Sequence, residues 1–264
     1  MTDDELKRDI ESIEVLHKTY KNAQAKQCAY MKLLSTILRE GQIMGPKEDK
    51  KQLYEAFFAQ AARMAEDCRN WDSFGFMLKM NGGYDFDSSG KIERKFSSYQ
   101  SSENPITKMA QIAPEAFEKY AAAQVGYQTN GQYLLIKLMA NKEAFGLNDE
   151  KLVDIMAAGL KIKEEKTNKH EIASLQHDIF TTLDGPRYES VRKTLIKKHP
   201  EIYEAAALSA AASKTRGIID PKVKMGLMDR FLEHVDTDFI KSHPDFASKT
   251  KALAASKDLQ QVRE

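Results

Sequence analysis

The stretch that decides the fold is residues 3–38, DDELKRDIESIEVLHKTYKNAQAKQCAYMKLLSTIL. Apolar side chains recur in it every three, four or seven residues, without an internal Gly or Pro: Leu6, Ile10, Ile13, Leu16, Tyr20, Ala23, Tyr30, Leu34 and Ile37. Thr2 can cap the start, and the acidic residues 3–5 suit the positive end of a helix dipole. The spacing predicts one long amphipathic helix that ends near Gly41.

A second helix follows after the short loop Gly41–Gly45. Pro46 opens it, and its predicted apolar face consists of Leu53, Phe57, Ala61, Met64, Cys68 and Trp71. Short loops join antiparallel neighbours, so residues 1–71 are predicted to form an N-terminal helical hairpin.

The two helices of this hairpin differ in length. At 1.5 Å per residue the first spans about 54 Å and the second, residues 47–70, about 36 Å. Leu6, Ile10 and Ile13 are therefore left without a local cover, and we interpret them as an interaction stripe. The C-terminal half of the chain is the favoured cover, and a second copy or another protein is the alternative.

Residues 72–104 interrupt the helical pattern with four Gly and seven Ser. Tyr84 and Phe86 alternate against Ile92, Arg94 and Phe96 as in a small β-hairpin. We predict a loop-rich insertion that contains this one hairpin.

From residue 105 onward, residues that typically start and end helices recur along the chain. Pro residues open the helices, Asn148, Asn168 and Asp220 are candidate N-caps, and Gly146 and Gly217 are candidate C-terminal stops. The predicted helices cover residues 105–112, 114–125, 131–144, 149–165, 169–183, 186–198, 200–213, 221–235 and 244–260. The fold class predicted is all-α, with residues 105–264 as an array of paired helices.

One internal echo bears on the arrangement of that array. Residues 195–201, LIKKHPE, recur 44 residues later as residues 239–245, FIKSHPD, and Ala-rich helices follow both. Repeats of this length are typical of two-helix solenoids. Shared punctuation at a helix end explains the echo nearly as well, so a solenoid stays one of two open interpretations.

Composition limits the class of protein. Apolar residues make up 42% of the 264 residues, which excludes a disordered chain. The formal net charge is +1, which excludes a strong overall electrostatic attraction to nucleic acid or to an anionic membrane. No apolar run is long enough to span a bilayer, and the acidic N-terminus is unlike a secretory signal. With Cys28 and Cys68 read as reduced thiols, we expect a cytoplasmic protein, although export without a cleaved signal stays open.

Charge is unevenly distributed. Residues 186–224 carry nine basic and four acidic residues. A basic edge within this stretch is a second candidate interaction surface: Arg187, Arg192, Lys193, Lys197 and Lys198. Nucleic acid is not the expected partner, because interleaved stacking aromatics are missing.

A candidate metal site lies in the insertion. Residues 85–92, DFDSSGKI, resemble the opening of an EF-hand calcium loop, with Asp85, Asp87 and Ser89 as the oxygen donors and Gly90 at the sharp turn. Phe96 stands where the loop needs a bidentate glutamate. A hairpin turn needs the same residue types, and we favour the turn over a calcium site.

A second constellation is His170-Glu171 with His177-Asp178. The His-Asp pair in a helical chain resembles metal-dependent phosphohydrolases, but His170 and His177 are about 10.5 Å apart along one helix. Other catalytic and nucleotide-binding motifs are missing from the sequence. We therefore expect an interaction or adaptor protein without catalytic activity or cofactor, whose partner is another protein or a second copy, and a helical metal-dependent enzyme is the alternative.

Overall fold

A computed structural model describes residues 4, 7–8, 15, 47–69, 74, 84–86, 90–94, 105–128 and 131–256. The chain divides into two compact units, Met1–Ile162 and Lys163–Glu264. Asp4, Lys7, Arg8 and Val15 are helical, but the rest of the predicted helix 3–38 lies outside the described residues. The long N-terminal hairpin and the predicted division at residues 1–71, 72–104 and 105–264 stay predictions.

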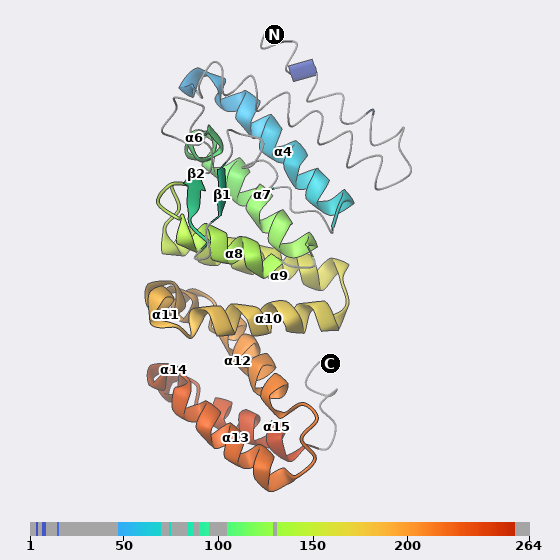
Figure 1. Ribbon diagram of the computed structural model, residues 1–264, viewed down its shortest axis with the longest axis vertical. Coiled ribbons are helices and arrows are strands. Elements are labelled where there is room, and N and C mark those ends of the chain that lie inside the picture. The colour runs from blue at the N-terminus through green and yellow to red at the C-terminus, as the bar shows by residue number, and fades with distance from the viewer. Residues whose placement is uncertain are drawn as a thin grey trace. The chain divides into compact units, whose positions relative to one another are not determined.

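The first unit is built around two packed helices. Its elements are the 3₁₀ turn η1 (Glu48–Lys50), α4 (Lys51–Asp67), β1 (Tyr84–Phe86), β2 (Ile92–Arg94), α6 (Pro105–Ile112), α7 (Pro114–Tyr127), α8 (Gly131–Ala140) and most of α9 (Asp149–Lys166) (Figure 1). Helix α4 packs along α7, and the short helix α6 contacts both.

An aromatic cluster forms the core of this unit. Phe58 on α4 meets Phe117 on α7 with ring centroids 5.4 Å apart, and Phe117 stacks on Phe145 at 5.1 Å. Phe74 completes the cluster, 5.4 Å from Phe145. All four rings are buried. Four members of the predicted apolar face are also buried, Phe57, Ala61, Met64 and Cys68, whereas Leu53 is only half-buried.

The β-hairpin lies where the sequence predicts one. Strands β1 and β2 are antiparallel, with Tyr84 opposite Arg94 and Phe86 opposite Ile92. Asn141, just after α8, holds the turn: its side chain donates to the Gly90 carbonyl at 2.7 Å and accepts from the Ile92 N–H at 2.8 Å. Gly90 has φ +80°, a conformation that glycine adopts without strain.

Two glycines allow α7 and α9 to approach closely. A Cβ at Gly159 would lie 2.6 Å from Val125 Cγ1, and a Cβ at Gly126 would lie 2.6 Å from Ile162 Cβ. Both distances are far below van der Waals contact, so any larger residue would push the helices apart.

The second unit continues from the end of α9. Its elements are α10 (Lys169–Leu183), the 3₁₀ turn η2 (Pro186–Tyr188), α11 (Glu189–Lys198), α12 (Pro200–Thr215), α13 (Pro221–His234), α14 (Thr237–Ser242) and α15 (Asp245–Ala255). Helix α10 packs on α12 and α13 packs on α15. Helix α12 carries four buried alanines, whose small side chains permit close packing against neighbouring helices: Ala206, Ala207, Ala210 and Ala211.

Three helix junctions share one backbone conformation. Ala113, His199 and His243 each precede a proline and have φ/ψ of −122°/61°, −139°/62° and −126°/71°. Each N–H donates to the carbonyl four residues earlier, at 2.9, 2.8 and 2.9 Å. A residue before proline avoids the helical region, so each short helix ends and a new helix begins in a new direction.

The helix predictions hold closely for residues 105–256. Helices α6 and α10 match their predicted ranges, and Asn148, Asn168 and Asp220 each accept a backbone N–H at a helix start, which confirms the predicted caps. Gly217 has positive φ just after α12, as expected at a helix stop, whereas α8 ends at Ala140, before the predicted residue 144, and Gly146 lies in the turn that follows. The predicted helix 186–198 is instead a 3₁₀ turn followed by α11, and α14 was not predicted.

Apart from the two short strands, the described segments are helices, turns and loops, and the fold class is all-α with paired helices. None of the described helices is both long and apolar enough to cross a membrane.

Candidate functional site

The predicted basic edge maps to one short segment of the second unit. Arg187 lies in η2, and Arg192, Lys193, Lys197 and Lys198 lie on α11. The segment forms a helix whose buried face consists of Val191 and Leu195. The structure therefore places the five residues on two consecutive elements, but it gives them different environments.

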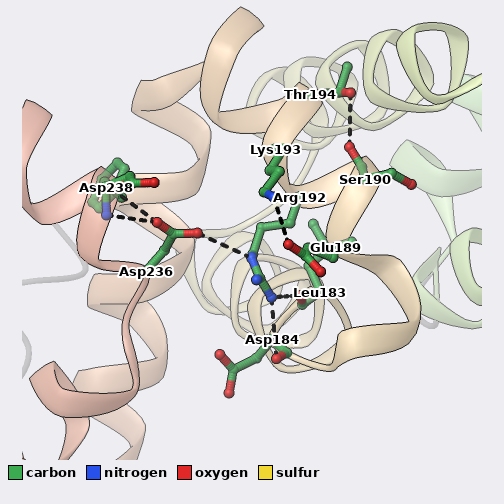
Figure 2. Close-up of polar contacts among 10 residues, drawn as sticks. Leu183, Asp184, Glu189, Ser190, Arg192, Lys193, Thr194, Asp236 and Asp238 are labelled. Carbon is green, nitrogen blue, oxygen red and sulfur yellow. Dashed lines mark hydrogen bonds and ion pairs between the residues drawn. The ribbon is translucent and has the colours of Figure 1, made fainter.

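Arg192 points into the protein rather than to solvent (Figure 2). Its Nη1 donates to the Leu183 carbonyl at 2.9 Å and to the Asp184 carbonyl at 3.3 Å, at the end of α10. Its Nε lies 3.7 Å from Asp236 Oδ2, and both side chains are only 16% exposed. Arg192 thus connects α11 with the end of α10 and the start of α14.

Asp236 serves two elements at once. Its Oδ1 accepts the N–H groups of Asp238 at 2.9 Å and Phe239 at 3.2 Å, which caps α14, while Oδ2 faces Arg192. A carboxylate at the helix start also suits the dipole of α14. The Arg192–Asp236 pair is therefore a structural junction and not a free anion site.

Tyr203 on α12 belongs to the same neighbourhood. Its side chain is fully buried, and its hydroxyl makes no hydrogen bond in the described part of the chain. Burial raises the pKa of the Tyr203 phenol well above its ordinary value of 10.0, with a smaller opposing effect from the Arg192 charge. Tyr203 is therefore neutral at every physiological pH.

Lys193 is occupied by a neighbour on the same helix. Its Nζ lies 2.6 Å from Glu189 Oε1, one helical turn away. This hydrogen bond lowers the pKa of Glu189 and raises that of Lys193. The pair is exposed, so it contributes little to the stability of the fold.

Arg187, Lys197 and Lys198 remain at the surface. All three are exposed, and the Arg187 guanidinium lies 5.2 Å from the centre of the Tyr188 ring. They are the members of the predicted edge that a partner can reach.

The structure does not bring His170-Glu171 and His177-Asp178 together in one site. Glu171 is used at the start of α10, where Asn168 Oδ1 accepts its N–H at 3.0 Å and the two side chains bond at 3.2 Å. His177 Nδ1 lies 3.4 Å from Asp178 Oδ1, and His170 is exposed. In the described ranges, no group of three or more His, Cys, Asp or Glu is placed to hold a metal ion.

The calcium-like segment is only partly described. Asp85 lies in β1 opposite Glu93 in β2, while Asp87 and Ser89 lie outside the described residues. The N-terminal stripe Leu6, Ile10 and Ile13 and the thiol of Cys28 also lie outside them. Cys68 is a buried free cysteine.

Sequence reasoning missed three functional or structural side chains. Asp236 and Asn141 act across 44 and 51 residues of chain, to Arg192 and Gly90, and no local pattern marks such contacts. Ile219, in the loop before α13, is 92% exposed. Its neighbours Gly217 and Asp220 were recognised as punctuation, and an isoleucine between a helix stop and a helix cap is the signal that could have found it.

Comparisons with protein-family models, with curated proteins and with solved structures found no match to this chain.

Proposed function

We propose that the chain is a helical adaptor that binds another protein through the surface of a repeated three-helix scaffold. The observation that carries this proposal is the recurrence of one arrangement: a long helix, a short helix, a junction before proline, and a third helix that packs back on the first. It occurs as α10–α11–α12 and α13–α14–α15, and also as α4–α6–α7, where residues 68–104 with the β-hairpin stand between α4 and α6. Repeated helical units present extended surfaces, which commonly bind macromolecules.

This recurrence also supports the solenoid interpretation of the sequence echo. The two echo segments fall at the second and third junctions, and Ala113-Pro114 occupies the first. The spacing from Pro114 to Pro200 is close to twice the 44-residue period of the echo.

The exposed part of the basic edge is the candidate contact surface. Lys197 and Lys198 lie together at the end of α11, and Arg187 lies on the preceding turn. The acidic Glu189 is already engaged by Lys193. A partner with an acidic surface fits this edge, because unlike charges across an interface guide association.

The test compares two charge-reversal variants of the full chain. Lys197→Glu with Lys198→Glu alters the edge, and Arg230→Glu with Lys241→Glu makes the same charge change on α13 and α14. A partner captured from lysate by wild type and identified by mass spectrometry is purified and titrated against all three proteins. We expect about tenfold weaker binding for the edge variant alone. Equal affinity of the edge variant and wild type would overturn the assignment of this surface.

Calcium binding is the second candidate function, and one observation favours it. The segment 85–92 resembles the opening of a calcium loop, and its Asp85 pairs with Glu93 in the backbone register of the hairpin. Isothermal titration with Ca²⁺ should give a heat of binding that Asp85→Asn removes. No heat at millimolar calcium would exclude this site.

The phosphohydrolase hypothesis is tested separately. Substitution of His177 and Asp178 should abolish any phosphodiesterase or nucleotidase activity of the purified protein, and unchanged activity would exclude the hypothesis.

A further inference from the structure

The loop between α12 and α13 presents an apolar side chain almost completely to solvent. Ile219 is 92% exposed, and Val223, one turn later on α13, is 50% exposed. Isoleucine and valine are among the residues most often buried. Two exposed aliphatic side chains therefore lie in this loop and in the first turn of α13, and we call them the Ile219 tip.

The backbone holds this tip in a fixed position. Gly217 ends α12 with φ +79°, and the Ile218 N–H donates to the Thr215 carbonyl at 3.1 Å. On the other side Asp220 Oδ1 accepts the Lys222 N–H at 2.8 Å and Pro221 starts α13. Because both ends are capped, the tip loses little conformational entropy when it docks.

Cations flank the tip on both sides. Arg216 and Lys222 stand three residues before and three residues after Ile219, and both are exposed. Neither forms an ion pair within the part of the chain that the structure describes. Lys214 is used elsewhere, since its ammonium lies 5.2 Å from the centre of the Phe231 ring. The only carboxylate within the loop, Asp220, is engaged as the helix cap.

We propose that the Ile219 tip docks onto an anionic lipid surface. Ile219 and Val223 enter the boundary between headgroups and acyl chains, while Arg216 and Lys222 contact the lipid phosphates and carboxylates. An aliphatic side chain that is 92% exposed stands on a convex tip. A protein partner would have to supply a preformed pocket for it, whereas a fluid bilayer needs none. This contact is separate from the α11 edge and does not depend on it.

The test is cosedimentation of the full chain with vesicles of phosphatidylcholine alone or with about 30% phosphatidylserine, at low and high salt. Two cations at an anionic surface correspond to about thirtyfold stronger partitioning, and salt should remove that difference. Ile219→Asp should reduce binding to the anionic vesicles by about tenfold or more, while Tyr133→Asp, at another exposed apolar position, should not.

Charge is tested by a second matched pair. Arg216→Glu with Lys222→Glu should abolish the preference for phosphatidylserine, whereas Lys197→Glu with Lys198→Glu, which changes the net charge equally, should retain it. Circular dichroism melting confirms that each variant folds. Equal partitioning of wild type to both vesicles, no partitioning at low salt, or wild-type binding by Ile219→Asp would each overturn the proposal. Binding of a protein that Ile219→Asp abolishes without any lipid binding would assign the tip to a protein partner instead.

Discussion

Arg192 illustrates how one residue can replace several weaker contacts. Its guanidinium satisfies two carbonyls at the end of α10 and faces the carboxylate that caps α14. The charges are largely buried, and a buried charge without its partner is costly. The junction therefore depends on the pair as a unit.

Substitution of Arg192 should destabilise the second unit. Arg192→Met leaves two carbonyls without their donor and removes the cation that faces Asp236 Oδ2, and we expect a loss of about 3 kcal/mol in urea unfolding. Asp236→Asn keeps an oxygen for the cap and should cost less than Asp236→Ala, by about 1 kcal/mol. A loss for Arg192→Met of under about 0.5 kcal/mol would mean that water replaces the guanidinium.

Tyr203 makes stability depend on alkaline pH. Its pKa is raised in the folded state, so its contribution to stability is complete below the ordinary pKa of 10.0 and is lost as the pH rises above it. Tyr203→Phe should therefore lose less thermal stability than wild type between pH 9 and pH 11. Parallel decreases of the two melting temperatures would show that the phenol ionises as readily folded as unfolded.

The charges of α11 could be counted from the sequence, but their roles could not. Arg192 follows Val191 and precedes Lys193, so in sequence it belongs to a run of surface cations. Its side chain bonds to the end of α10 and faces Asp236, which lies beyond two further helices. A prediction of that contact requires the fold, because no spacing rule relates the two positions.

At the scale of helices, two glycines occupy opposite environments, one in a tight helix contact and one at an open surface. Gly159 on α9 lies against Val125, whereas nothing lies within 4 Å of a Cβ placed at Gly226 on α13. Gly159→Ala should destabilise the protein by about 1–3 kcal/mol through overpacking. Gly226→Ala should stabilise it by about 0.5–1 kcal/mol, because alanine is the better helix former. Chemical unfolding of both variants measures the contrast, and destabilisation by both would contradict the difference in packing.

Caps and prolines explain why the elements were predictable. Asn168 and Asp220 accept backbone N–H groups two or three residues later, and Pro200 is the first residue of α12. These interactions are local, so the local sequence is enough to predict them. Helix α14 escaped prediction because it has only six residues, Thr237–Ser242, too few for an apolar period to emerge. Asp236 caps the start of α14, and a single capping residue before so short a segment does not predict a helix.

At the scale of the molecule, each unit has its own aromatic core. Phe117 meets Phe58 and Phe145 in the first, while Tyr203 meets Phe239 at 4.9 Å in the second. All contacts of Arg192 lie within the second unit. Arg192→Met should therefore accelerate hydrogen exchange in α10–α15 more than in α4 and α7. Uniform acceleration would identify a single cooperative unit.

The junctions before proline have a consequence for how such a chain changes during evolution. Two of them use histidine and one uses alanine, yet the chain turns alike at all three. The turn needs only the proline ring and a carbonyl four residues back, so the amino acid between them is free to drift. Replacement of His199 or His243 by alanine should thus leave the direction of the following helix unchanged, and chemical shifts of the backbone next to each proline would measure it.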